Sequence, residues 1–168
     1  MSKVYTIFKT KIGWIGLEKS NCGISLITFP QKNITQCEAL VCANNSHANK
    51  SDSDFSHIIN QIHLYTSGKN VEFNSIKLDY RGYTEFSKKT LEACRNVPYG
   101  ETRSYKWLAD KAGSEFAYRS VGQIMAKNKF PIIVPCHRII GATGKLTGFR
   151  GKKHDLNMKT RFLNLENI

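Results

Sequence analysis

Long hydrophobic runs are absent from this 168-residue chain. No stretch approaches the roughly 20 consecutive apolar residues that a membrane-spanning helix needs, so we expect no membrane partner. The N-terminus begins with alternating polar and apolar residues and lacks the apolar core of a signal peptide. These two absences predict a soluble intracellular protein.

Acidic residues are scarce: the chain has 13 Asp and Glu but 25 Lys and Arg, which gives a formal net charge of +12. Such an excess favours a polyanionic partner, since each neutralised phosphate releases counterions and adds affinity that does not depend on sequence. A membrane surface would attract the same charge. However, no amphipathic helix combines a concentrated basic face with an apolar face rich in Trp and Leu. The charge therefore indicates nucleic acid.

Cysteines are few and odd in number: Cys22, Cys37, Cys42, Cys94 and Cys136. They form no paired framework, so we expect free thiols in a reducing compartment. Cys37 and Cys42 with His47 match no strong zinc-binding pattern, and no second pair of ligands follows them. We predict neither a metal ion nor a cofactor.

The first half of the chain has the pattern of a small unit of strands and helices. Short β-prone runs within residues 4–30 are separated by turn residues, which predicts a β-meander. Residues 31–53 are polar and predict a surface loop around a short helical piece. Apolar residues at helical spacing predict a helix from Asp54 to Tyr65, and Val71–Phe73 is a candidate final strand.

The second half is dominated by helical patterns. Thr84 is placed to cap a helix that continues to Cys94, and Ser104 to cap a short helix over 104–110. A tight turn with Gly113 leads into a further helix over 115–127. A short helix, a turn and a second helix form the outline of a helix-turn-helix, which together with the net charge favours DNA binding.

These patterns predict an α+β fold made of two domains. Residues 1–80 form a small N-terminal domain of β-sheet and helices with a structural role. Residues 81–168 form a mostly helical, winged-helix-like domain that contains the helix-turn-helix.

The segment Ile132–Ile140 contains the side chains that indicate chemistry. A hydrophobic strand is expected here, and it delivers Cys136, His137 and Arg138 side by side. A thiol beside an imidazole is typical of a nucleophile, because thiolate is the reactive form and a nearby base makes it accessible near neutral pH. An isolated pair of this kind is more often structural. The DNA-binding features around it favour a reactive cysteine.

Three motifs in this half resemble one family. Pro135-Cys136-His137-Arg138, preceded by Asn128-x-x-Pro131 and by Tyr118-Arg119-Ser120-Val121-Gly122, closely resembles the O6-alkylguanine-DNA alkyltransferases, also called methylated-DNA–protein-cysteine methyltransferases. The resemblance covers residues 84–166, including Tyr-x-x-Leu-Ala at Tyr105 and Phe162-Leu163-x-x-Glu166. It implies a single-turnover DNA-repair enzyme without a cofactor, with residues 81–168 as the DNA-binding and alkyl-acceptor domain.

The resemblance also implies the catalytic residues. Cys136 would accept the alkyl group from O6 of guanine, irreversibly and once per molecule. His137 would relay the thiol proton through a bound water, and Glu166 would orient and charge the imidazole. Asn128 would tie the recognition helix to the active-site strand, and Arg138 would pair with carboxylate or carbonyl groups behind the site.

A guanine inside a duplex must be flipped out to reach a buried thiol. Arg119 matches the family's arginine finger, which fills the gap left in the base stack, and Tyr105 matches the tyrosine that crowds the neighbouring phosphate. In the family the recognition helix enters the minor groove, where readout is degenerate and small side chains permit close approach. Small residues on this helix include Ala117, Ser120 and Gly122.

Residues 141–149 would close over the flipped base. The carbonyl groups of Val134 and Cys136 are candidates to accept a hydrogen bond from the exocyclic amine, which would select guanine. The residues expected to contact the base are Val134, Pro131, Thr147 and Phe149.

The chain departs from the family pattern in three places. Lys129 replaces a proline, which loosens that hinge and adds a charge near DNA. Phe149 stands where tyrosine is common, so a hydroxyl contact is lost. The stretch 150–156 before the last helix is longer than usual, which bears on the shape of the loop and on which alkyl groups fit.

Three other functions each account for part of the sequence. A non-catalytic alkyltransferase-like lesion-binding protein would replace the reactive cysteine, typically by tryptophan, whereas Cys136 is present. A helix-turn-helix regulator would need a dimerisation or effector domain, a role left open for the β-rich N-terminal half. A cysteine hydrolase would leave the DNA-binding features unexplained.

The resulting prediction is a monomer that flips O6-alkylguanine out of double-stranded DNA. We expect it in the cytoplasm in association with the nucleoid, or in the nucleus if the source is eukaryotic.

Overall fold

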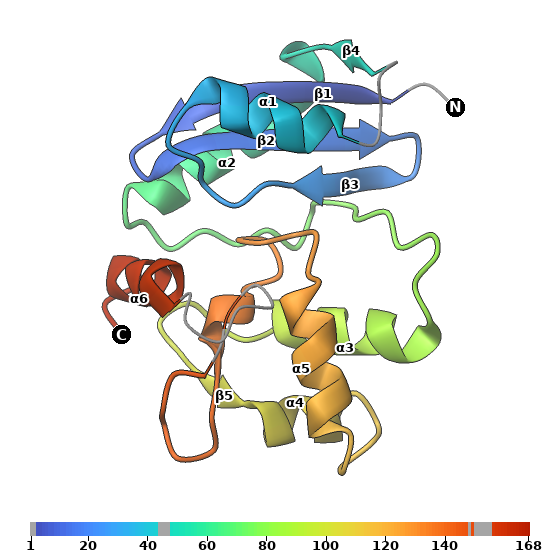
Figure 1. Cartoon of the computed structure of the whole chain (residues 1–168), viewed down its shortest axis with the longest axis vertical. Coiled ribbons are helices and arrows are strands. Elements are labelled where there is room, and N and C mark those ends of the chain that lie inside the picture. The colour runs from blue at the N-terminus through green and yellow to red at the C-terminus, as the bar shows by residue number, and fades with distance from the viewer. Residues whose placement is uncertain (1–2, 44–47, 148, 150–155) are drawn as a thin grey trace. The chain divides into compact units, whose positions relative to one another are not determined.

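The computed structural model describes residues 3–43, 48–147, 149 and 156–168. The chain divides into two compact units (Figure 1). The first unit comprises Met1–Tyr80 and Lys129–Pro131, and the second comprises Arg81–Asn128 and Ile132–Ile168. The short segment 129–131 therefore belongs with the N-terminal unit, although the chain has already entered the second unit before it.

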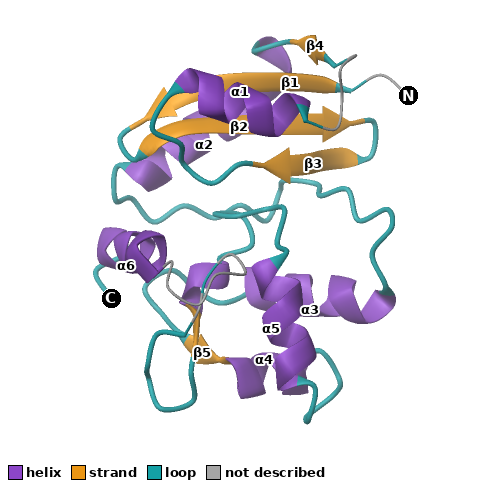
Figure 2. Ribbon diagram, in the orientation of Figure 1, coloured by secondary structure: helices purple, strands orange, loops and turns teal. Residues whose placement is uncertain are grey.

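The first unit contains a four-stranded sheet in the order β3-β2-β1-β4 (Figure 2). Strands β1 (Val4–Thr10), β2 (Gly13–Ser20) and β3 (Gly23–Ile27) are antiparallel neighbours, which confirms the predicted β-meander. The outer strand β4 (Asn49–Lys50) pairs in parallel with β1, at residues for which the sequence predicted a surface loop.

Two helices cover opposite faces of this sheet (Figure 1). Ile7 of β1 packs with Val41 on one face, whereas the ring of Phe8 lies 5.5 Å from the ring of His63 on the other. Successive side chains of a strand point to opposite faces, so the two helices sandwich the sheet. The helices are α1 (Ile34–Cys42) and α2 (Ser56–Thr66).

The predicted helix 54–65 is confirmed as α2, preceded by a 3-10 turn, η1 (Ser53–Phe55). The predicted strand Val71–Phe73 is wrong. Phe73 instead packs its ring against Tyr65 of α2, with centroids 6.0 Å apart. The chain returns to the sheet only beyond it, where the Ile24 amide donates to the Lys77 carbonyl at 2.8 Å.

Three helices of the second unit pack against one another. The two predicted N-caps are confirmed: Thr84 Oγ1 accepts from the amide of Ser87 at 3.1 Å, and Ser104 Oγ accepts from the amide of Trp107 at 3.0 Å. Each bond satisfies a donor that the first turn leaves without an intrahelical partner. The three helices are α3 (Glu85–Arg95), α4 (Tyr105–Lys111) and α5 (Tyr118–Ala126).

The predicted helix-turn-helix is formed by α4 and α5. Gly113 ends the first helix with a φ of +88°, a left-handed conformation that glycine adopts without steric cost. The second helix begins at Tyr118 rather than at residue 115, because the Ala117 amide closes a turn on the Ser114 carbonyl. Ala117 thus occupies the N-cap position of α5.

The strand expected before Cys136 is wrong. Residues 132–134 form turns, and Ile132 has a φ of +76°, which a β-strand does not permit. The backbone then forms a 3-10 turn, η2 (Cys136–Arg138), before the short strand β6 (Ile139–Ile140). This strand pairs in parallel with β5 (Arg103–Ser104).

The last helix is α6 (Leu156–Leu165), which packs against η2. With helices and small sheets in both units, the predicted α+β class is confirmed. None of the helices in the described part of the chain is long and apolar enough to cross a bilayer.

Candidate functional site

Cys136 begins the 3-10 turn η2 and has only 2% of its surface exposed. Burial raises the pKa of its thiol, while a hydrogen bond with the Asn128 side chain and the charge of Lys159 act in the opposite direction. The net effect is a raised pKa, so the resting group is a thiol. A nucleophile at this position therefore needs a base to take its proton.

His137, the next residue, is buried and hydrogen-bonded to the side chain of Glu166. Its Nε2 lies 2.8 Å from Oε1 of Glu166, and its ring stacks on Phe162 with centroids 4.9 Å apart. Burial lowers the pKa of His137 below its usual value, and the hydrogen bond and charge of Glu166 offset this only in part. The imidazole is thus neutral near pH 7.

Glu166 is a carboxylate held by several donors. Burial alone would raise its pKa, but hydrogen bonds and charge from His137 and Arg138 outweigh burial and lower the pKa to about 2. Arg138 donates from Nε and Nη2, both at 2.9 Å, and the Gly100 amide donates at 3.3 Å. Arg138 also donates to the Val97 carbonyl, so it joins two segments of the chain behind the cysteine.

The ionised state of Glu166 fixes the tautomer of His137. A carboxylate only accepts hydrogen bonds, so the His137 Nε2 facing it must carry the proton. The other ring nitrogen, Nδ1, then holds the lone pair and is able to accept a proton. This is the nucleophile, base and orienting carboxylate order found in other cysteine enzymes.

A cavity of about 510 Å³ lies within the second unit, next to the helix-turn-helix. Four of the predicted site residues line it: Tyr105, Arg119, Gly122 and Thr147. Tyr105 and Thr147 share a side-chain hydrogen bond, while burial raises the pKa of Tyr105. A Cβ added at Gly122 would meet no atom within 4 Å, so this face of α5 is open.

Comparison with known proteins decides the family. The family model of the 6-O-methylguanine DNA methyltransferase DNA-binding domain matches residues 85–168. A Bacillus subtilis protein, the constitutive methylated-DNA–protein-cysteine methyltransferase, is 34% identical over 164 residues, covering 98% of this chain and 95% of that protein. This chain belongs to the methylated-DNA–protein-cysteine methyltransferase family.

Other members of the methyltransferase family agree. A Mycobacterium tuberculosis methylated-DNA–protein-cysteine methyltransferase is 40% identical over 134 residues, covering 80% of this chain and 78% of that one. The crystal structure of M. tuberculosis OGT in complex with DNA is similar with a TM-score of 0.78 and 34% identity, covering 96% of this chain and 91% of that chain. The resemblance inferred from Pro135–Arg138 is confirmed.

Lys159 was missed by sequence reasoning, although its charge acts on Cys136. It is fully buried on α6, donates from Nζ to the Ile139 carbonyl, and lies 5.6 Å from the ring centre of Tyr105 and 5.8 Å from that of Phe149. Burial lowers its pKa to about 8, against the opposing effect of Cys136. No local pattern distinguishes it from the other lysines of a basic chain.

Two more of the predicted residues, Asn128 and Val134, are joined to each other and to the backbone of Cys136. Asn128 Nδ2 donates to the Val134 carbonyl at 2.9 Å, as expected for a link between α5 and the segment before Cys136. The Val134 carbonyl also accepts from the Cys136 amide at 2.8 Å, so contact with a guanine amine would require one of these bonds to open. Ser120 is exposed and Phe149 is buried.

Two predicted residues lie outside the second unit. Lys129 and Pro131 belong to the first unit, where the Lys129 carbonyl accepts from the Ile27 amide of β3 at 2.8 Å. Of the loop expected to close over the base, residue 148 lies outside the described residues. The same holds for positions 150–155, where the sequence departs from the methyltransferase pattern.

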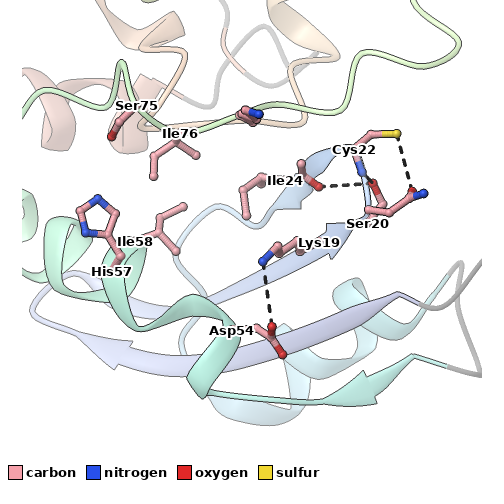
Figure 3. Close-up of a pocket in the computed structure, with 12 residues that line it drawn as sticks. Lys19, Ser20, Cys22, Ile24, Asp54, His57, Ile58, Ser75 and Ile76 are labelled. Carbon is pink, nitrogen blue, oxygen red and sulfur yellow. Dashed lines mark hydrogen bonds and ion pairs between the residues drawn. The ribbon is translucent and has the colours of Figure 1, made fainter.

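A second cavity, of about 320 Å³, lies in the first unit beside α2 and the β2–β3 turn (Figure 3). Lys19 Nζ is 4.0 Å from Asp54 at its edge, and His57 points toward it from α2. It contains none of the predicted site residues.

Proposed function

We propose that this protein repairs DNA by transferring an alkyl group from O6 of guanine to its own Cys136. Family membership confirms the class of activity, which is alkyl transfer from DNA to a protein cysteine. The observation that carries the assignment of residues is the 2.8 Å contact of His137 with a buried, ionised Glu166, directly after a buried cysteine.

The proposed step forms one bond and breaks another. Cys136 Sγ attacks the alkyl carbon, the carbon–sulfur bond forms, and the bond from that carbon to O6 breaks. The thiol proton passes to Nδ1 of His137, and a proton returns to the guanine product, so atoms and charge balance. Glu166 stabilises the imidazolium in between. A thioether is not cleaved by any group of this site, so each molecule acts once.

The charge distribution supports DNA binding by the second unit. This unit holds 16 of the 25 Lys and Arg and seven of the 13 Asp and Glu, a net charge of +9, which leaves +3 for the first unit. The M. tuberculosis relative has been crystallised in complex with DNA. We assign Arg119 as the side chain that replaces the flipped nucleotide, because it is exposed and lines the cavity.

The cavity is the proposed site of the flipped base. Tyr105 and Thr147 line it with their shared hydrogen bond, and the open face at Gly122 supports close approach of α5 to a groove. Ala117 at the N-cap and Ser120 in the first turn are other small residues of α5, and neither lines the cavity. Close approach of a helix in this way suits the minor groove, where readout of sequence is degenerate.

The two halves of the chain have different proposed roles. Residues 81–168 bind DNA and accept the alkyl group, whereas residues 1–80 are structural and carry no reacting side chain. We propose that the protein acts as a monomer and is located with the DNA of the cell. Size-exclusion chromatography with and without duplex DNA tests the oligomeric state.

Intact-mass spectrometry tests the reaction. The protein is mixed with a duplex that contains one O6-methylguanine, and peptides are then mapped. We expect one methyl group on Cys136, one equivalent per molecule and no turnover. Cys136→Ser abolishes the gain in mass and keeps DNA binding, whereas Cys22→Ser, at an exposed thiol, reacts like the wild type.

The alternative function, a lesion-binding protein without transfer, predicts a different outcome. The wild-type protein would then bind the methylated duplex tightly and selectively, and its mass would remain unchanged. Residual methylation of the Cys136→Ser protein would contradict the choice of acceptor.

A further inference from the structure

Two aromatic side chains are exposed at the start of α5. Phe116 has 84% of its surface exposed and Tyr118 has 47%, and no other Phe, Tyr or Trp in the described part of the chain is exposed. Single exposed apolar residues are common on protein surfaces. Two such residues separated by one position, with every other described Phe, Tyr and Trp at least partly buried, form a distinct surface feature.

This aromatic pair adjoins the proposed DNA-binding side chain. Tyr118 lines the 510 Å³ cavity together with Arg119 and Lys106, and Phe116 lies in the turn that leads into the helix. One carboxylate, that of Glu115, also belongs to this turn. The exposed rings therefore lie at the edge of the proposed base site, within the unit that carries a net charge of +9.

Chain geometry sets how far Phe116 can be from the flipped nucleotide. It lies three positions before Arg119 in the chain, so the two Cα atoms are at most about 11 Å apart. Base pairs are stacked about 3.4 Å apart along the duplex. A ring at Phe116 is therefore within about three base steps of the gap that Arg119 fills.

An exposed ring at such a position has a natural partner in nucleic acid. Proteins that bend or open a duplex from the minor groove insert apolar side chains, phenylalanine among them, between base steps. Aromatic rings also stack on unpaired bases with little dependence on sequence. Neither the wedge contact nor the stacking contact needs a charge. Either one therefore adds binding energy to that of the phosphate contacts made by lysine and arginine.

We propose that Phe116 and Tyr118 form an aromatic wedge that contacts nucleotides beside the flipped guanine. Phe116 unstacks a neighbouring base step, and Tyr118 packs against the extruded nucleotide at the mouth of the cavity. The wedge deepens the proposed function and rests on it, because it assumes that α5 faces the DNA. It makes these two residues positioning groups for the substrate, distinct from the groups that react.

The test compares two binding variants with a matched control. Phe116→Ala and Tyr118→Ala are made in the unreactive Cys136→Ser protein, so that binding is measured without transfer. Leu64→Ala removes a side chain that is 54% exposed on α2 of the first unit and serves as the control. The probe is a duplex with one O6-methylguanine and with 2-aminopurine in the adjacent base pair.

We expect Phe116→Ala to raise Kd on the order of tenfold, the usual loss when a base loses its aromatic partner. The slope of log Kd against log salt stays unchanged, because no phosphate contact is lost. The rise in 2-aminopurine fluorescence on binding, which reports unstacking, falls in Phe116→Ala and persists in Phe116→Leu, since leucine also acts as a wedge. Leu64→Ala changes neither quantity.

The proposal is overturned if Phe116→Ala and Tyr118→Ala bind as tightly as Leu64→Ala and give the same fluorescence rise. Matching thermal unfolding of the variants excludes loss of fold as the cause of weak binding. Failure of the proposed function looks different, because the wild-type protein would then show no methyl on Cys136 whatever the affinities of these variants.

Discussion

Arg138 and Glu166 form a buried, two-pronged ion pair, with Nε and Nη2 of the arginine each 2.9 Å from a carboxylate oxygen. The same carboxylate accepts a hydrogen bond from His137 Nε2 at 2.8 Å. The arginine therefore keeps the carboxylate ionised and in place, and the carboxylate sets the tautomer of the histidine. This linked pair connects the acid–base chemistry of the site to the stability of the fold.

The first prediction concerns acid stability. The pKa of Glu166 is about 2 in the folded protein and near 4.5 in the unfolded chain, so its pairing stabilises the fold above pH 4.5 and is lost as the pH falls toward 2. The loss amounts to about 3 kcal/mol at most. The lowered pKa of His137 acts in the same direction, because the unfolded imidazole binds protons more readily.

Urea unfolding at a series of pH values checks this loss. The Glu166→Gln protein loses less stability between pH 4.5 and 2 than the wild type does. In Glu38→Gln, at an exposed carboxylate of α1, the free energy of unfolding falls with pH as steeply as in the wild type. If the free energy of unfolding fell equally steeply with pH in Glu166→Gln and in the wild type, the Glu166 carboxylate would not be held ionised.

The second prediction concerns the pH dependence of transfer. Burial lowers the pKa of His137, so the imidazole remains neutral and able to accept a proton below its usual pKa of about 6.5. The single-turnover rate should therefore stay level through pH 6.5 and fall only at lower pH.

Substitution of His137 tests its role directly. Replacing it by Gln should slow transfer by about 10²- to 10⁴-fold, the usual contribution of a general base. His57→Gln, at an exposed histidine of α2, should leave both the rate and the profile unchanged. An unaltered rate in His137→Gln would remove this residue from the mechanism.

The third prediction concerns Lys159. Its charge lowers the pKa of the Cys136 thiol against the effect of burial, so Lys159→Met should raise that pKa further. The rate of reaction with free O6-benzylguanine should fall at neutral pH and recover as the pH rises. Lys88→Met, at an exposed lysine of α3, is the control. A uniform loss at every pH would indicate damage to packing instead.

The fourth prediction separates DNA handling from chemistry. Arg119→Ala should slow repair of a methylated duplex more than reaction with free O6-benzylguanine, because only the duplex requires a nucleotide to be flipped out. Rates on both substrates measured side by side give the ratio. Arg161→Ala, at an exposed arginine of α6, should leave the ratio at its wild-type value. Equal losses on both substrates would refute the finger assignment.

The elements that depend on local chemistry were predictable from the sequence. The β-meander follows from β-prone runs and turn residues, and the starts of α3 and α4 follow from the side chains of Thr84 and Ser104. The turn at 132–134 was not predictable from the sequence, because an apolar run has the same composition whether it is extended or folded back. Only tertiary contacts, such as that of Asn128 with the Val134 carbonyl, reveal the difference.

The candidate site was predictable where its residues are adjacent in sequence. Cys136 and His137 are neighbours, so their pairing is visible, whereas Glu166 lies 29 residues from His137 and was placed only by the resemblance to the family. Lys159 was invisible for a physical reason: lysine is ordinarily exposed, and nothing in the local sequence signals that this one is buried.

Burial of Cys136 has a consequence for selectivity toward reagents other than DNA. A protein that reacts once is inactivated by any electrophile that reaches its thiol, including small alkylating agents and oxidants. A cysteine residue that is 2% exposed, with a thiol pKa raised by burial, presents little thiolate to such molecules. The same burial that makes the thiol dependent on a base thus keeps it intact until the protein meets the one damaged nucleotide that it can repair.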